Sequence, residues 1–362
     1  MIADRTISFL IIVLSFCIFF AEASASDNIR VAIADDQKTV MLASSSGLEA
    51  GRISSGAQGK KMMLNYTSMD REWVRVRSAS EFIRVNGKSY RGWVEVRKKK
   101  NGRLLVINDV NIEDYLAGVV SAEVPVTWKL EALKAQAVAS RTYALYQKRE
   151  AGNRPYHILA TEMGQVYNGS STERTNSLRA VQETKGYVIV YHGEIIPAFY
   201  HSSCGGHTEN ASEFWGIDEP YLRGVECDCQ KISPYGLWEK RVEISKVVSA
   251  LRQLGYRVNS ITDMDIGNLT QAGRVKTVLI HTADKAVSVP GESLRAALGN
   301  AVVPSAFFEL EMIEGEAIFS GRGRGHGVGL CQWGAQEMAL RGYDFGSILS
   351  YYYPGTNLAR LK

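Results

Sequence analysis

Apolar and polar residues alternate along the chain from Ile29 to about Val106, which is the period of half-buried β-strands. The alternation is clear in the segments IRVAIA, EWVRVRSA, EFIRVNG and YRGWVEVRKK, and the tripeptides NGK and NGR mark turns. The pattern predicts a β-rich N-terminal part over residues 28–107.

Beyond Val110 the apolar spacing becomes helical. The segment NIEDYLAGVVSAE predicts a short helix capped by Asn111, and Pro125 ends it. An apolar stripe over residues 130–150 predicts the strongest helix of the chain. We expect further helices over 177–186, 243–255 and 331–343, and strands in YVIVYHGEIIPAFYHSS, RVKTVLIHT and SAFFELEMI. The fold class is therefore α+β, with the β-rich part continuous with a helix-containing part over residues 108–360.

Between Gly321 and Gly329 the chain reads GRGRGHGVG, with glycine at every odd position. If this segment is extended, one face has no side chains and the other carries Arg322, Arg324, His326 and Val328. Glycine inside a strand usually marks the close approach of a ligand or of another backbone. The spacing does not form either phosphate-binding glycine motif, so a nucleotide loop is not predicted.

The first 25 residues form a segment with a pattern of its own. Arg5 precedes an apolar run from Ile7 to Phe20, and AEASA offers a cleavage site, so residues 1–25 are predicted to be a signal peptide. We expect a secreted, periplasmic or wall-associated protein without a transmembrane anchor after cleavage. The formal net charge of +4 suits an anionic surface. The basic cluster VRKKKNGR is best interpreted as a solvated hairpin end, so no nucleic-acid partner is expected.

The phrase VVSAEVP places Glu123 between apolar neighbours, just before a proline and the long helix. Burial disfavours a charged carboxylate and raises its pKa, which suits a general acid near neutral pH. An exposed acid in an interhelical turn is the alternative interpretation of this residue.

Four ordered segments resemble one known family. VNIEDYLAGVVSAEVPVTWKLEALKAQAVASRTYAL, ATEMGQVYNG, YHSSCGGHTEN and GRGHGVGLCQWGAQEMALRGYDFGSILSYYYPGT resemble the SpoIID/LytB family of bacterial wall proteins, whose founding member acts in sporulation. The resemblance spans about residues 28–360 and makes 108–360 the catalytic domain. It implies a peptidoglycan lytic transglycosylase that cleaves MurNAc–GlcNAc bonds of peptide-stripped glycan strands and leaves 1,6-anhydroMurNAc ends. Glu123 matches the family's catalytic glutamate, and no second carboxylate stands out as its partner.

Other residues of these motifs are expected to bind the glycan, with packing as the alternative for each. Arg141 offers a guanidinium fork for the lactyl carboxylate of muramic acid. On the bare face of the glycine segment a sugar polymer is expected to pass, with His326 at its edge. The full set of expected substrate-binding residues is Gln136, Arg141, Tyr143, Gln165, Tyr167, His326 and Gln332.

No cofactor is required by this chemistry, although a structural metal or a disulfide is predicted near Cys204. Zinc-binding relatives carry ligands in a stretch where this chain has Leu159, Met163 and Gly164, so that site is missing. Cys331 is expected to be buried and unpaired. A second cluster remains, either a structural zinc site or a disulfide from Cys204, with these candidate ligands: His201, Cys204, His207, Cys227 and Cys229.

A second function stays open beside the enzyme. The chain could be a non-catalytic wall-binding module or an amidase enhancer, with a cell-wall amidase as partner. A zinc metallopeptidase is poorly supported, because the sequence has no H-E-x-x-H motif.

Overall fold

The computed structural model describes residues 27–50 and 60–361. The predicted signal peptide lies outside the described residues. Among the described helices, none has both the length and the apolar character needed to cross a membrane.

The N-terminal part is β-rich, as the alternation predicted. Six strands form one sheet in the order β10-β1-β9-β8-β5-β3, and a second sheet has the order β4-β2-β6-β7. Strands β1 and β9 pair antiparallel, with Ile29 opposite Val110, so that apolar residues of both strands enter one core. The strands of this part are β1 (Asn28–Gln37), β2 (Thr39–Ala43), β3 (Leu48–Ala50), β4 (Lys61–Asn65), β5 (Trp73–Ser78), β6 (Ile83–Val85), β7 (Lys88–Tyr90), β8 (Trp93–Lys98), β9 (Leu104–Asn111) and β10 (Ile158–Leu159).

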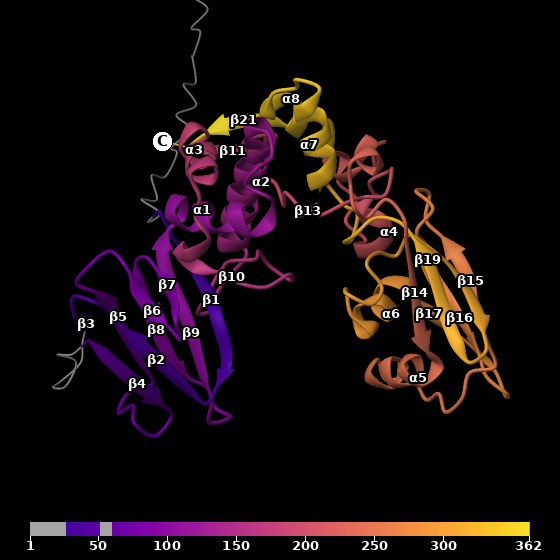
Figure 1. Cartoon of the computed structure of the whole chain (residues 1–362), viewed down its shortest axis with the longest axis horizontal. Coiled ribbons are helices and arrows are strands. Elements are labelled where there is room, and N and C mark those ends of the chain that lie inside the picture. The colour runs from indigo at the N-terminus through magenta and orange to yellow at the C-terminus, as the bar shows by residue number, and fades with distance from the viewer. Residues whose placement is uncertain (1–26, 51–59, 362) are drawn as a thin grey trace, which may run out of the picture.

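Helices pack at one end of these sheets and share their core (Figure 1). The Asn111 side chain accepts a hydrogen bond from the backbone N–H of Glu113, which confirms the predicted cap of α1. The helices and the small sheet β12-β11-β21 beside them are α1 (Ile112–Glu123), α2 (Leu130–Arg149), α3 (Thr175–Glu183), α7 (Gln332–Leu340), α8 (Phe345–Tyr352), the 3-10 turn η1 (Gly169–Thr172), β11 (Tyr187–Tyr191), β12 (Glu194–Ile195) and β21 (Asn357–Arg360). The α+β class is confirmed.

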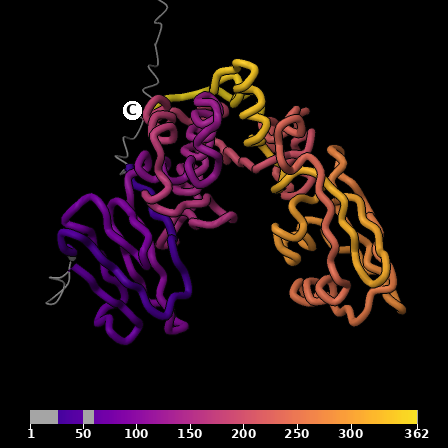
Figure 2. Tube along the Cα trace, in the orientation of Figure 1, coloured from indigo at the N-terminus to yellow at the C-terminus, as the bar shows by residue number. Residues whose placement is uncertain are grey.

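A second lobe has its own apolar core, built by residues between Val242 and Phe319. Figure 2 shows the chain leaving the first lobe, building this second lobe and returning through α7 and α8. Its sheets have the orders β14-β19-β18 and β15-β16-β17. Its elements are β14 (Trp238–Glu243), α5 (Ile244–Gln253), β15 (Asp263–Leu269), β16 (Val275–His281), β17 (Ala286–Pro290), α6 (Gly291–Leu298), β18 (Phe308–Ile313) and β19 (Glu316–Gly321). The short helices α4 (Ala211–Trp215), η2 (Pro220–Leu222) and η3 (Asp228–Lys231) lie in the connection that leads to this lobe, and their buried residues belong to the first core.

The glycine segment is not the extended strand that its alternation predicted. Gly323, Gly325, Gly327 and Gly329 all have positive φ, between 71° and 102°, a region that favours glycine. A Cβ on Gly323 would lie 2.8 Å from the carbonyl oxygen of Ser203, and one on Gly327 would lie 2.6 Å from the Arg274 guanidinium. The bare positions are therefore filled by the protein's own backbone and a buried arginine, which corrects the expectation of an open sugar-lined face.

Candidate active site

A cleft of about 690 Å³ lies between the two lobes. The first lobe contributes Glu123 and Tyr143, and the second contributes Tyr235, Arg295 and Asn300. The cleft is also lined by residues of the connections between the lobes, which are Phe199, Tyr200, Trp215, Arg324, His326 and Gln332.

Glu123 is the last residue of α1, and three donors hold its half-buried carboxylate. The backbone N–H of Val166 donates to Oε1 at 2.8 Å, and the Tyr200 hydroxyl donates to the same oxygen at 3.4 Å. The Gln332 amide donates to Oε2 at 3.3 Å. Two donors thus occupy Oε1, while Oε2 has a single donor and room for a proton.

Burial raises the pKa of Glu123 above the ordinary value for glutamate. The hydrogen bonds from Val166, Gln332 and Tyr200 act in the opposite direction, because they stabilise the carboxylate, but burial has the larger effect. Glu123 therefore combines a raised pKa with a fixed orientation, which suits a group that gives and takes a proton.

Gln165 and Tyr167 do not line the cleft, contrary to the expected substrate contacts. Gln165 is fully buried, accepts from the Tyr115 hydroxyl at 2.9 Å and donates to the carbonyl of Ser140 at 3.1 Å. The Tyr167 hydroxyl donates to Asn108 at 3.1 Å. Both side chains point into the core and leave the N–H of Val166, which lies between them, facing Glu123.

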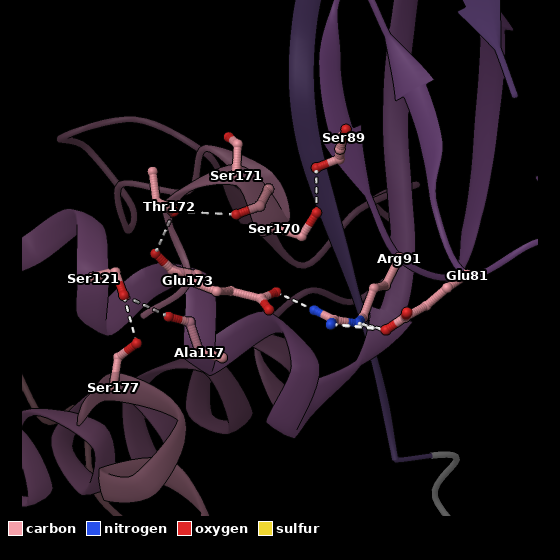
Figure 3. A network of polar contacts seen from close by, with 12 residues as sticks. Glu81, Ser89, Arg91, Ala117, Ser121, Ser170, Ser171, Thr172, Glu173 and Ser177 are labelled. Atoms are coloured by element: carbon pink, nitrogen blue, oxygen red, sulfur yellow. Dashed lines mark hydrogen bonds and ion pairs between the residues drawn. The ribbon is translucent and has the colours of Figure 1, made fainter. Parts of the chain in front are cut away.

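A polar network anchors the segment that follows Val166 (Figure 3). The Ser170 hydroxyl donates to the carbonyl of Ser89 in the second N-terminal sheet, and Ser121 of α1 donates to Ser177 of α3 at 2.6 Å. Arg91 pairs with both Glu173 and Glu81. These contacts fix η1 and α1 against the N-terminal sheets, so the geometry at Glu123 depends on the β-rich part of the chain.

The second donor, Tyr200, is held by His326. Strand β13 (Tyr200–His201) pairs in parallel with β20 (Leu330–Cys331). His326 Nδ1 accepts from the N–H of Val328, so Nε2 carries the hydrogen and donates to the carbonyl of Tyr200 at 3.0 Å. Burial, with Arg295 nearby, lowers the pKa of His326 to about 4, and the ring is neutral near pH 7. His326 lines the cleft and also positions Tyr200.

Two further expected contacts are absent from the cleft. Arg141 is buried in α2, where its guanidinium makes a bidentate pair with Glu113 at 2.9 and 2.6 Å. Gln136 is buried as well and donates to Ser140. The fork geometry of Arg141 was predicted, but its partner is an internal carboxylate rather than a sugar acid. Tyr143 and Gln332 do line the cleft.

Several cleft residues escaped the sequence analysis. Glu162 lies at the rim with 63% of its side chain exposed, and it accepts from Asn300 at 3.0 Å. Arg324 approaches Glu162 and donates to Tyr235. Trp215 packs against Phe199 with 4.9 Å between ring centroids. Each of Tyr200, Glu162 and Arg324 lies in one of the quoted family motifs, but nothing in those motifs set it apart as a cleft residue.

The structure also changes the set of candidate metal ligands near Cys204. Four buried sulfurs, from Cys204, Cys227, Cys229 and Cys331, lie within 4.8 Å of one another, and none is in a disulfide. Cys331 was expected to stand apart and instead completes the group. His201 and His207 do not belong to this group, and their Nδ1 atoms contact the backbone carbonyls of Val328 and Thr208.

Comparisons with known proteins agree with this architecture. A family model described as stage II sporulation protein (SpoIID) matches residues 100–191, and a domain of unknown function (DUF8618) matches residues 209–329. Stage II sporulation protein D of Bacillus subtilis is 32% identical over 272 residues, which cover 70% of this chain and 76% of that protein. An uncharacterized protein of Brachyspira hyodysenteriae is 34% identical over 262 residues, covering 71% of this chain and 69% of its own length.

The chain belongs to the SpoIID family. It is also similar to a protein of Bacillus subtilis named amidase enhancer, with 30% identity over 327 residues. That match covers 78% of this chain but 45% of the enhancer, so the chain spans about half the length of that relative.

Proposed function

We propose that the protein is an exported lytic transglycosylase that cleaves MurNAc–GlcNAc bonds of peptide-stripped glycan strands. The observation that carries the proposal is Glu123, a carboxylate with a raised pKa and three fixed donors in a cleft between two lobes. Membership of the SpoIID family supports a role at the bacterial wall.

In the proposed reaction Glu123 acts twice. Its Oε2 proton passes to the glycosidic oxygen as the bond from that oxygen to the anomeric carbon breaks. The carboxylate then takes the proton of the muramic acid 6-hydroxyl while O6 bonds to the anomeric carbon. Glu123 is protonated again, no water is consumed, and the new end is a 1,6-anhydro sugar.

The lining of the cleft is compatible with an anionic sugar chain. Trp215 and Tyr143 offer aromatic surface for sugar rings. Arg324, whose side chain is 36% exposed, is the cleft residue best placed to meet a lactyl carboxylate, the task first expected of Arg141.

Glu162 raises the question of ordinary hydrolysis, because a glycosidase needs two carboxylates. This second carboxylate lines the same cleft as Glu123 but is exposed and bonded to Asn300. We expect the wild-type protein and Glu162→Gln both to release anhydro-ended fragments from peptide-free strands, as identified by mass spectrometry. Reducing ends from the wild type, lost in Glu162→Gln, would instead establish a hydrolase.

The pH dependence of the activity should follow Glu123. Because the reaction needs the protonated acid, kcat/KM is expected to fall as pH rises through a pKa above the usual glutamate value. Gln332→Leu removes a donor that stabilises the carboxylate, so the pKa rises further and the alkaline limb moves to higher pH. An unmoved limb in this variant would mean that another group controls it.

A non-catalytic role in wall binding or amidase enhancement is the second candidate, favoured by the name of the amidase-enhancer relative. A binder has no need for a raised pKa at Glu123. Strand binding and amidase stimulation without any fragment release would support this alternative.

A further inference from the structure

We propose that Cys204, Cys227, Cys229 and Cys331 bind one zinc ion. The ion would join the segments that contain strands β13 and β20, next to the cleft. The chain has five cysteines, and all of them except Cys17 of the predicted signal peptide converge on this cluster. Cys204 and Cys331 meet there although they are 127 positions apart in the sequence.

The spacing of the sulfurs fits a tetrahedral metal. Four thiolates at the usual zinc–sulfur distance lie about 3.8 Å from one another. Here Cys204 and Cys229 are 3.4 Å apart, and every pair lies within 4.8 Å. This is too long for a disulfide, whose sulfurs are about 2.05 Å apart. Four equivalent sulfurs around one centre are the ligand set of structural zinc sites.

Donors around the cluster point at the sulfurs, as expected for thiolates that share a cation. The N–H groups of Cys204 and Gly334 lie 3.3 and 3.4 Å from the sulfur of Cys331. The Tyr352 hydroxyl is 3.1 Å from the sulfur of Cys227. Cys331 is also the N-cap of α7, where the helix dipole favours a negative charge.

The position of the cluster indicates what the metal does. Cys331 precedes Gln332, and Cys204 follows β13, which begins with Tyr200. Tyr200 and Gln332 are the two side chains that donate to the Glu123 carboxylate. Cys227 and Cys229 belong to the segment at η3, packed on α7. A zinc ion would therefore lock two of the donors of Glu123 into one rigid unit without touching the glycan itself.

The test is metal analysis of the full-length protein purified without added chelator. We expect about one equivalent of zinc per chain, sulfur-only coordination by X-ray absorption and, after Co²⁺ replacement, the visible absorption of a tetrahedral thiolate centre. Cys229→Ser should lose most of the zinc. His207→Ala is the matched control and should keep it, because its ring lies outside the sulfur group.

Two outcomes overturn the proposal. The first is a folded, zinc-free protein whose mass is lower by two hydrogens for each disulfide. It would show that the cysteines form disulfides and do not bind zinc. Loss of zinc in His207→Ala would show that the ligand set includes histidine. Both results come from the wild type or from His207→Ala, so they do not depend on whether Cys229→Ser folds.

Discussion

Glu123→Gln is expected to lower the release of anhydro-ended fragments by about 10²- to 10⁴-fold, the usual contribution of a general acid–base residue. Glutamine keeps the shape of the side chain, and its carbonyl oxygen can still accept from the N–H of Val166. What it loses is the proton that Oε2 gives to the leaving oxygen. The measurement is the initial rate of fragment release from peptide-free strands.

The comparison with Glu162→Gln makes this test specific. Both variants replace one carboxyl group of the same cleft with a neutral amide of the same shape. Only Glu123 has the buried, three-donor environment of a proton carrier. Equal losses in the two variants would indicate a two-carboxylate mechanism, and an unchanged rate in Glu123→Gln, with normal thermal unfolding, would remove the proposed catalytic role.

Arg141→Met should destabilise the protein by about 3–5 kcal/mol, the cost of breaking a buried ion pair by removing one partner. The guanidinium is 1% exposed and holds both oxygens of Glu113, whose negative charge would lose its cationic partner. Its hydrogen bond to the carbonyl of Tyr187 would be lost as well. The free energy of unfolding in urea measures this effect.

Arg149→Ala, on the same helix, is the matched control. Arg149 is half-exposed and pairs with Glu194 at the surface, so its loss should cost less than about 1 kcal/mol. Adding Glu113→Gln to Arg141→Met should restore part of the stability, because the unpaired charge is removed. An Arg141→Met protein of normal stability but raised KM would return Arg141 to the glycan-binding role.

The sequence predicted local features well where a short segment decides them. Asn111 caps α1 because its side chain reaches an N–H two residues away. The strands expected in YVIVYHGEIIPAFYHSS form as β11 and β12, joined by a turn at His192–Gly193 with positive φ at both residues. The prediction of an extended strand in the glycine segment was wrong for a related reason. Alternating glycines fit an extended strand and a left-handed kinked segment equally well, and the contacts with Ser203 and Arg274 select the second.

The motifs predicted only part of the cleft lining, because the direction of a side chain depends on elements far apart in the chain. Tyr143, His326 and Gln332 line the cleft as expected. The sequence predicted Gln165 and Tyr167 to bind sugar. In the structure their side chains form hydrogen bonds with Tyr115 and Asn108 in the core. The donor that reaches Glu123 is instead a backbone N–H between them, which no side-chain pattern reveals.

The sequence by itself determined the α+β class, the capped start of α1 and the position of Glu123 at the end of an apolar helix before Pro125, since periodicity, caps and breakers act over a few residues. The tertiary structure alone decided that Arg141 pairs internally, that Cys331 rather than two histidines completes the sulfur cluster, and that Tyr200 and Gln332 meet Glu123. Each of these depends on the parallel pairing of β13 with β20 or on the packing of α1 against α2, which bring together residues that are distant along the chain.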